Sequence, residues 1–379
     1  MGIKGGPLQK LPGGNSYIYG LQKAGLAGKP VNLDAGGLMY YSALRNERRF
    51  LDGDYYPAAR SFQDEIAYLR FILKWDLLVV FDGKDPAWKD AEHDRRYGDD
   101  TVDDDGINTK IRNNGTYIAL CAKVCAGLKI PYVVSALEAD TQVVKWRRDK
   151  NPVIVTGDSD IVAYDIRMKV VLISSWNMDS EKFRIYDIGI VNESLFEKYP
   201  LYEAICNFGS MSLLVWAAAC GCDFSPNASG IAGIGETTIL KAFETLKKKY
   251  VVDGDLIYDV SLTDFASSLV EECPPGFRRR GITKEDVLAE LEYISDCFKR
   301  KGQYYNKKGD VLSMEDNVVS ASSDDTVKHM IGLTDPKTGV AFTEEEQHIL
   351  DEYDPSDELH PSRNMTLSAA ELPKNRTSV

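Results

Sequence analysis

The stretch VIVTGDSD, residues 153–160, carries the first clear sign of the fold of this chain. Val153–Thr156 is apolar and β-branched, which is typical of a short strand that is buried on both faces. Gly157 ends that strand, and Asp158 and Asp160 follow it at positions i and i+2. Ligands of open parallel sheets bind outside the carboxyl ends of the strands. The stretch therefore places two carboxylates where chemistry is expected, although an Asp after a strand can also cap the next helix.

Other strand-like runs end in the same way, and so does one apolar helix. The acidic residues in these positions are Asp34, Asp82, Glu138, Asp140, Asp158, Asp160 and Asp223. Carboxylates that converge at one edge of a sheet repel each other, by about 4 kcal/mol for two charges ~4 Å apart at an effective dielectric constant of about 20. All-oxygen ligands suit Mg²⁺ or Mn²⁺. The set thus indicates a centre of two metal ions that hydrolyses phosphodiester bonds. Alternatively, these acidic residues are only helix caps and solvated turn residues.

Predicted strands and helices alternate in the first half of the chain. The strands are expected at 29–34, 76–81, 130–134, 153–156, 170–173 and 183–186, with helices at 61–74 and 111–128 among them. This alternation predicts an α/β fold with a doubly wound, mostly parallel sheet. From residue 192 the pattern is helical, with helices expected at 211–220, 236–250, 258–271 and 283–299.

The composition is that of a globular protein, with 379 residues of which 44% are hydrophobic and 27% charged. No apolar run reaches membrane-spanning length, and the start of the chain lacks the apolar region of a secretory signal. We therefore expect no membrane association and no secretion. The seven Cys residues lack metal-binding spacing, which indicates free thiols in a reducing compartment.

The net charge of −13 is unevenly distributed along the chain. Residues 311–379 contain 14 Asp/Glu and 5 Lys/Arg, so this stretch alone carries −9. Since much of the remaining negative charge belongs to the candidate metal ligands, the overall charge does not exclude nucleic acid as a partner.

In their order, these motifs resemble those of the flap endonuclease/XPG family of structure-specific 5′ nucleases. The matching motifs are Met1–Gly5, Val31–Asp34, Val80–Lys84, Glu138–Asp140, Thr156–Asp160 and Gly221–Phe224, within roughly residues 1–250. The resemblance implies a PIN-like nuclease domain at 1–190 with a short arch at 84–110. It further implies a helical DNA-binding region at 191–310, with a helix–two-turn–helix at 221–250. Residues 311–379 are expected to form an acidic, partly disordered tail.

The resemblance also implies roles for single residues. Asp34, Asp82, Glu138, Asp140, Asp158, Asp160 and Asp223 match the seven carboxylates that bind two Mg²⁺ ions, for which Mn²⁺ can substitute. Lys89 and Arg96 match the basic pair that contacts the scissile phosphate, and they lie two helical turns apart, so that one helix face could present both. Tyr40 matches an aromatic residue on which a base stacks, and Gly2 would approach the active site.

The glycine-rich loop at Gly230, Gly233 and Gly235 resembles the DNA-binding turn of the family, which often holds a K⁺ ion. Glycines let the backbone approach a phosphate, which the N–H groups at the start of the next helix can bind. Lys241 and Lys247–Lys249 would add phosphate contacts. Each of these features is also compatible with an ordinary turn or a solvated helix face.

The resemblance implies a monomeric nuclease acting on branched or nicked DNA in DNA repair or replication, by endo- or exonucleolytic cleavage. It would be located in the nucleus if eukaryotic and otherwise in the cytoplasm. No Gln-x-x-Leu-x-x-Phe-Phe motif for a sliding clamp is recognisable. Two alternatives remain open: a nuclease of the same fold that acts on RNA, and a non-catalytic scaffold that binds nucleic acid or protein. A scaffold would be expected to lose carboxylates, and this chain retains all seven.

Overall fold

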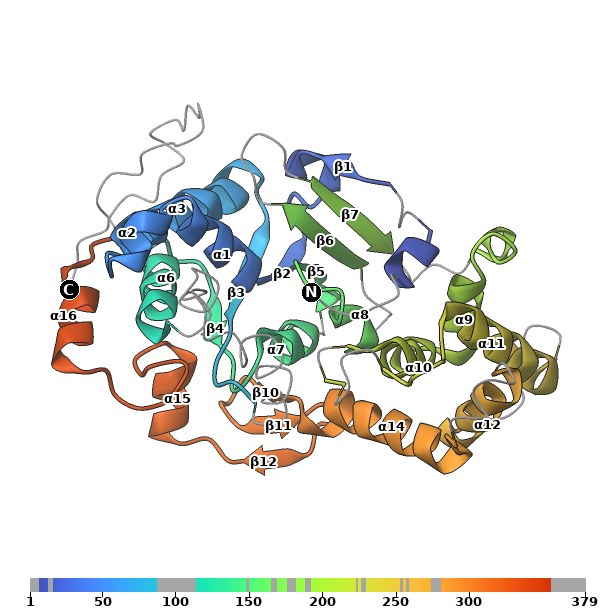
Figure 1. Ribbon diagram of the computed structural model, residues 1–379. Helices are drawn as coiled ribbons and strands as arrows, with labels where there is room; N and C mark the ends of the chain where they lie inside the picture. Colours follow the sequence, from blue (N-terminus) through green and yellow to red (C-terminus); the bar gives the residue numbers. More distant parts are fainter. Residues whose placement is uncertain are drawn as a thin grey trace.

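The computed structural model describes residues 7–12, 16–86, 114–147, 150–164, 169–175, 182–187, 192–222, 224–225, 230–252, 255–256, 259–273 and 281–355. Its centre is a seven-stranded sheet with the strand order β1-β7-β6-β5-β2-β3-β4 (Figure 1). In that order the strands are β1 (Ile18–Tyr19), β7 (Lys182–Asp187), β6 (Lys169–Ser175), β5 (Val153–Thr156), β2 (Pro30–Asp34), β3 (Asp76–Phe81) and β4 (Tyr132–Val134).

The strand directions confirm the doubly wound, mostly parallel α/β sheet. β2 pairs in parallel with β3 and β5, and β4 and β6 continue the parallel sheet on either side. Only β7 runs against its neighbours β6 and β1. The chain leaves β2 for β3 and β4 and then returns to the other side of β2 for β5. The boundary between β2 and β5 is therefore the topological switch point, where ligand crevices form in such sheets.

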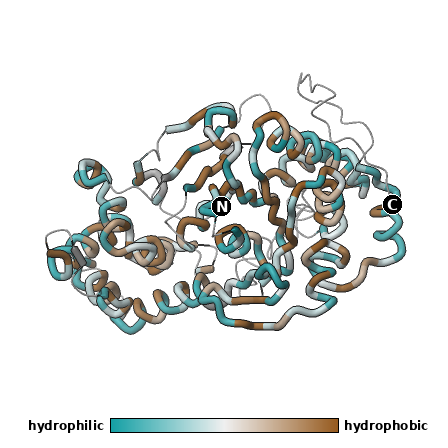
Figure 2. Tube along the Cα trace, turned by 180° about the vertical axis from the view of Figure 1, so that it is seen from behind, coloured by the Kyte–Doolittle hydropathy of each residue, from teal (hydrophilic) through white to brown (hydrophobic). Residues whose placement is uncertain are grey.

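Helices cover both faces of the sheet. One face carries α1 (Gly36–Leu44), α3 (Tyr56–Ala67) and α6 (Gly115–Gly127), and the other carries α7 (Ala139–Lys145), α8 (Ile161–Tyr164) and α10 (Met211–Cys220). Alternate residues of β3 divide between the two cores: Val79 and Phe81 pack toward the first layer, and Val80 packs toward the second. Figure 2 shows the hydrophobic segments concentrated in the strands and in the helix faces against them. Burial on both sides explains why these strands are continuously apolar.

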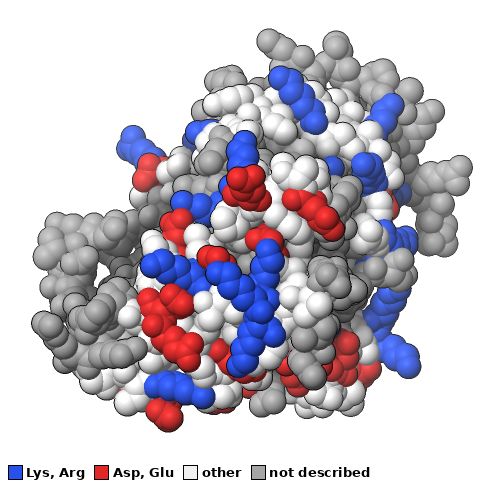
Figure 3. Space-filling view, turned by 90° about the vertical axis from the view of Figure 1, so that its right-hand side faces the viewer, with Lys and Arg blue, Asp and Glu red and all other residues white. Residues whose placement is uncertain are grey.

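The helical region contains α9 (Pro200–Phe208), α11 (Glu236–Tyr250), α12 (Leu262–Glu272) and α14 (Lys284–Asp296), which continues as a π-helical turn, η7 (Cys297–Lys301). Ser261 and Thr283 begin α12 and α14 with capping boxes, close to the predicted starts. On the side of the molecule that these helices form, basic and acidic side chains are intermixed (Figure 3). None of the helices among the described residues combines the length and apolar composition that crossing a membrane requires.

Shorter elements complete this part of the chain. They are η1 (Pro7–Lys10), η2 (Leu21–Ala24), α2 (Glu47–Leu51), the π-helical η3 (Tyr68–Ile72), η6 (Glu193–Leu195), β8 (Val251–Val252) and β9 (Asp255–Leu256). The predicted helix at 61–74 thus corresponds to α3 and η3, which begin earlier, at Tyr56.

The stretch from residue 303 to residue 355 forms further elements and wraps around the sheet (Figure 1). These are β10 (Gln303–Tyr305), β11 (Val311–Ser313), β12 (Val318–Ser320), α15 (Asp324–Met330) and α16 (Glu344–Glu352). The backbone of Tyr305 exchanges two hydrogen bonds with the side-chain amide of Gln142 on α7, at 2.8 and 3.0 Å.

Residues 311–355 of the expected acidic tail pack against the sheet domain. Leu350 and Tyr353 are buried against α3 and α6, and the Tyr353 hydroxyl lies 3.0 Å from the side-chain oxygen of the buried Gln63. Buried apolar side chains fix the segment to the core, while most of its acidic residues lie on the surface. Residues 356–379 lie outside the described residues.

Candidate active site

Three of the predicted metal ligands end neighbouring parallel strands at the switch point. Asp34 is the last residue of β2, Asp82 directly follows β3, and Asp158 comes two residues after β5. The register aligns Asp34 with Val80 on β3, and its neighbour Leu33 with Val155 on β5. The sheet therefore brings these three carboxylates to one edge, as the sequence predicted.

Hydrogen bonds connect the ends of these strands. Asp34 Oδ1 accepts a hydrogen bond from the backbone N–H of Gly36 at 2.9 Å, and Asp34 Oδ2 accepts one from the Thr156 hydroxyl at 2.7 Å. The same hydroxyl oxygen accepts the backbone N–H of Asp158 at 3.0 Å. Thr156 thus couples the carboxylate of β2 to the turn that follows β5. The pattern of a single sequence did not single out this threonine, because it looks like any other β-branched residue of the strand.

Asp82 is tied to the start of α7. Its Oδ1 accepts the backbone N–H of Ala139 at 2.8 Å. Ala139 lies between Glu138, which is the N-cap residue of α7, and Asp140, which is in its first turn. The strand-end carboxylate therefore fixes the helix start that carries the next two predicted ligands.

The carboxylates of Asp34 and Asp82 flank one small space above the sheet edge. A methyl group added to Gly36 would lie 3.3 Å from Asp34 Oδ1 and 3.7 Å from Asp82 Oδ2. Burial raises the pKa of Asp34 to about 7, and the negative charges of Asp82 and, to a smaller extent, Asp158 add to this effect. The hydrogen bonds from Thr156 and Gly36 act in the opposite direction. A cation in this space would relieve the repulsion.

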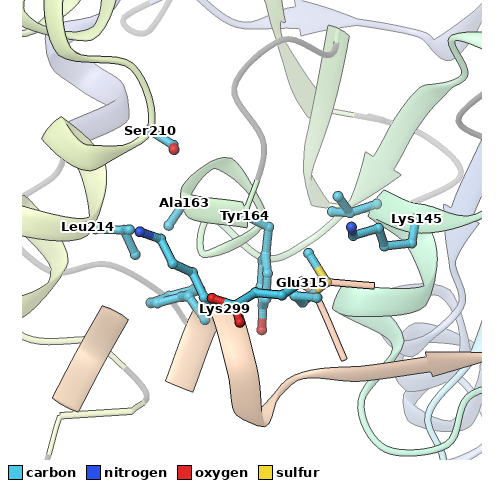
Figure 4. A pocket seen from close by; sticks show the side chains of 10 residues that line it. Lys145, Ala163, Tyr164, Ser210, Leu214, Lys299 and Glu315 are labelled. Atoms are coloured by element: carbon cyan, nitrogen blue, oxygen red, sulfur yellow. The ribbon is translucent and has the colours of Figure 1, made fainter. Parts of the chain in front are cut away.

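A second group of carboxylates surrounds Tyr164 at the end of α8. Burial raises the pKa of this phenol, and the charges of Asp140, Glu138, Asp160 and Asp158 raise it further. Because Asp158 also acts on Asp34, it belongs to both groups. Tyr164 lines a cavity of about 150 Å³. Figure 4 shows Lys145 from α7, Tyr164 from α8, and Lys299 and Glu315 from the C-terminal part around this cavity.

The chemistry of these side chains fits a hard divalent cation, because they offer only oxygen donors and repel each other without one. Among the described residues, however, no three Asp, Glu, His or Cys side chains are close enough together to hold a metal ion. The predicted ligand Asp223 lies outside the described residues, as do Gly2, Lys89 and Arg96. The carboxylates are thus gathered at one edge without being closed around a common point.

Tyr40 lies on α1, the helix that follows Asp34. It is half-buried against the core, and its ring packs edge-on against Tyr41 with the ring centroids 5.4 Å apart. It is in the middle of α1, six residues after Asp34. This geometry is that of a packing residue with part of its surface exposed.

The predicted helix–two-turn–helix contains glycines with specific backbone roles. Gly230 has φ +65°, and a Cβ there would lie 2.4 Å from the carbonyl oxygen of Ala219, so only glycine lets the loop cross the end of α10. Gly233 also has a positive φ, of 91°. Gly235 is the N-cap of α11, has an extended backbone and faces open space. Within the part of the chain that the structure describes, no side chain caps this helix start.

The lysines of α11 differ in their surroundings. Lys247 forms an ion pair with Glu203, and Lys248 forms one with Glu244 at 2.7 Å. Lys249 lies over the ring of Tyr250, with 4.7 Å between Nζ and the ring centroid. Lys241 is exposed and forms no ion pair with any residue that the structure describes. The predicted basic face is therefore partly neutralised by neighbouring acids, in agreement with the mixed charges of Figure 3.

No family model and no curated protein matches the sequence. Solved structures similar to this chain include the catalytic core of Rad2 in complex with a DNA substrate, at 15% identity and a TM-score of 0.45, covering 89% of this chain and 96% of that one. Human GEN1 in complex with Holliday junction DNA matches at 16% identity and a TM-score of 0.40, covering 73% and 74%. Flap endonuclease-1 from Methanococcus jannaschii matches at 14% identity and a TM-score of 0.42, covering 74% and 96%.

Proposed function

We propose that this chain is a Mg²⁺-dependent, structure-specific 5′ nuclease that hydrolyses phosphodiester bonds of DNA at branches or 5′ ends. The observation that carries the proposal is the crowding of Asp34, Asp82 and Asp158 at the switch point of a parallel sheet, with the pKa of Asp34 raised to about 7 by burial and by its neighbours' charges. Carboxylates that repel each other destabilise the folded protein when no cation is bound. Such charge clusters at the ligand-binding edge of a sheet are typical of functional sites.

The carboxylates of Asp34, Asp82, Glu138, Asp140, Asp158, Asp160 and Asp223 are the proposed ligands of two Mg²⁺ ions. When bound, such ions supply charge stabilisation for the phosphodiester oxygens and lower the pKa of a water molecule. The surrounding residues orient the ligands: Thr156 and Gly36 fix the Asp34 carboxylate, and Asp82 anchors the start of α7. Mn²⁺ could replace Mg²⁺, because it prefers the same donors.

Other predicted residues would bind the substrate. Lys89 and Arg96 are proposed to neutralise the scissile phosphate, with Tyr40 and Gly2 beside the cut. Gly230, Gly233 and Gly235 would let the backbone before α11 approach a duplex phosphate, with a K⁺ ion in this loop and with Lys241 as a further contact. In this organisation residues 1–190 form the nuclease domain and 191–310 the region that grips duplex DNA, as a monomer.

The test is cleavage of a labelled panel in Mg²⁺ that contains a 5′ flap, a nicked duplex, a bubble, a blunt duplex and a single-stranded RNA. We expect the wild type to cut branched DNA, and Asp158→Ala to abolish cutting while DNA binding is retained. Asp52→Ala removes an exposed carboxylate elsewhere and should cut normally. Cleavage of RNA alone would replace this proposal by the RNA-directed nuclease, and binding without any cleavage would replace it by the scaffold.

A further inference from the structure

An aromatic–cationic patch lies at the β1 end of the sheet and has no part in the function proposed above. It consists of Tyr17 and Tyr19, at and beside β1, and Lys182 and Arg184 on β7. The Lys182 ammonium lies 3.8 Å from the centre of the Tyr17 ring, and the Arg184 guanidinium lies 4.0 Å from it. Arg184 also donates a hydrogen bond to the Tyr17 hydroxyl.

The register of β1 and β7 explains why these four side chains lie together. Ile18 pairs with Phe183, and Tyr19 pairs with Lys182. Directly opposed residues of two strands share a face, and faces alternate along a strand. Phe183 is completely buried on one face, so Tyr19 and Lys182 are on the other, together with Tyr17 and Arg184. The strand pair thus forms a ladder of two aromatic rings and two cations.

The topology places this ladder at the same edge of the sheet as the carboxylates. β1 and β6 both run antiparallel to β7, so β1 runs in the same direction as the parallel strands. Tyr19, the last residue of β1, therefore lies at the edge of the sheet where the parallel strands end. Lys182 pairs with Ser175 on β6, three residues beyond Leu172, which pairs with Thr156 on β5. Three strand spacings, about 14 Å in total, separate β1 from β5.

Packing against the described residues leaves both rings of the patch partly exposed. Tyr19 is 53% exposed and Tyr17 is 37% exposed, whereas Ile18 between them is partly buried against the core. Both cations lie over the ring of Tyr17, and Tyr19, two residues further on the same face, is the more exposed ring. Exposed aromatic rings next to cations are typical of sites for unpaired nucleotides, because a base stacks on a ring and the cations attract its phosphate. An edge strand that only faced solvent would not need aromatic side chains at positions 17 and 19.

We propose that this aromatic–cationic patch binds an unpaired stretch of the nucleic-acid substrate, with a base stacked on Tyr19 and its phosphate beside Lys182. The separation of about 14 Å from β5 corresponds to about four base steps of 3.4 Å. The patch would therefore hold the single-stranded part of a substrate while the carboxylate edge faces the phosphodiester to be cut. This proposal rests on the proposed nuclease function for its substrate class, and its binding test does not require cleavage.

The experiment measures fluorescence anisotropy in EDTA with two labelled DNA duplexes that differ only in a 5′ single-stranded thymidine arm. Tyr19→Ala should weaken binding of the armed duplex by about 5- to 100-fold and leave the blunt duplex within about twofold. Tyr19→Phe keeps the ring and should bind as the wild type does. Lys182→Ala should reduce the salt dependence of binding to the armed duplex.

Lys29→Ala is the control for Lys182, because Lys29 is an exposed lysine that directly precedes β2, at the opposite edge of the sheet from the carboxylates. It should leave binding of the armed duplex unchanged. Equal losses for both duplexes in Tyr19→Ala, or an equal loss in Tyr19→Phe, would overturn the proposal. A wild type that cuts DNA while Tyr19→Ala binds normally refutes the patch and leaves the nuclease intact. If binding of the armed duplex needs Tyr19 but the wild type cuts no DNA, the patch is supported and the proposed nuclease function is refuted.

Discussion

The hydroxyl of Thr156 donates a 2.7 Å hydrogen bond to Asp34 Oδ2 across the switch point between β5 and β2. Thr156 is fully buried, and its oxygen also accepts the backbone N–H of Asp158. One side chain therefore stabilises the ionised form of Asp34 and orders the turn that carries Asp158. The two carboxylates are held at a fixed separation by the fold itself.

Replacing this hydroxyl should destabilise the protein and disturb the site. Thr156→Val keeps the shape but leaves Asp34 Oδ2 without the hydroxyl donor and the Asp158 N–H without its acceptor. We expect the free energy of unfolding to fall by about 1–3 kcal/mol, measured by urea denaturation in EDTA. Thr156→Ser retains the hydroxyl and should lose less than about 1 kcal/mol. Equal losses in the two variants would show that the methyl group, and not the hydrogen bonds, is responsible.

Neutralising Asp34 should stabilise the metal-free protein in a pH-dependent way. Its pKa is about 7 in the folded chain and 3.8 as the reference for the unfolded chain, so the folded state binds more protons between these values. Stability contributed by Asp34 is therefore lost as the pH rises from about 4 to about 7. Relative to Asp34→Asn, the wild type should lose at most about 4 kcal/mol over this range, and less to the extent that solvent reaches the carboxylate.

The measurement is urea unfolding of both proteins in EDTA at several pH values. Asp52→Asn, at an exposed position, should give a difference that is flat with pH. Adding Mg²⁺ above pH 7 should stabilise the wild type more than Asp34→Asn, because a ligand that binds the folded state stabilises it. A pH-independent difference between the wild type and Asp34→Asn would contradict the crowding of carboxylates.

Two glycines before α11 should respond in opposite ways to the same substitution. Gly230→Ala introduces a Cβ 2.4 Å from a backbone oxygen at a φ of +65°, and we expect a loss of about 2 kcal/mol or more. Gly235→Ala adds a methyl group in open space at an extended φ and should change the unfolding free energy by less than about 1 kcal/mol. Thermal unfolding of the two variants provides the comparison, and similar melting temperatures would argue against the described loop.

The C-terminal segment should contribute to the stability of the α/β fold. Tyr353 is 6% exposed, stacks on Tyr56 with centroids 5.6 Å apart, and bonds to Gln63. Tyr353→Ala should cost about 3–5 kcal/mol, as for a buried aromatic residue, whereas Tyr353→Phe should cost only about 1 kcal/mol for the lost hydrogen bond. Chemical denaturation measures both, and a negligible effect of Tyr353→Ala would contradict the packing of this segment against α3.

The sequence by itself determined the parallel strands of the sheet and the position of its acidic edge. Runs such as Val153–Thr156 are apolar on both faces, and a parallel strand between two helical layers is the structure that uses such a run. Because parallel strands end at the same edge, Asp34, Asp82 and Asp158 could be placed together without coordinates. These expectations depend only on local pattern and on strand direction.

Only the tertiary structure decided which groups act on these carboxylates. The Thr156–Asp34 bond joins residues 122 positions apart in the sequence, and the contact of Tyr353 with Gln63 spans 290. The same holds for Lys247, whose partner Glu203 belongs to another helix. Local composition predicts none of these pairs, because burial and pairing arise when distant segments pack. For the same reason, the acidic composition of residues 311–355 gave no sign that a few buried side chains fix this stretch to the core.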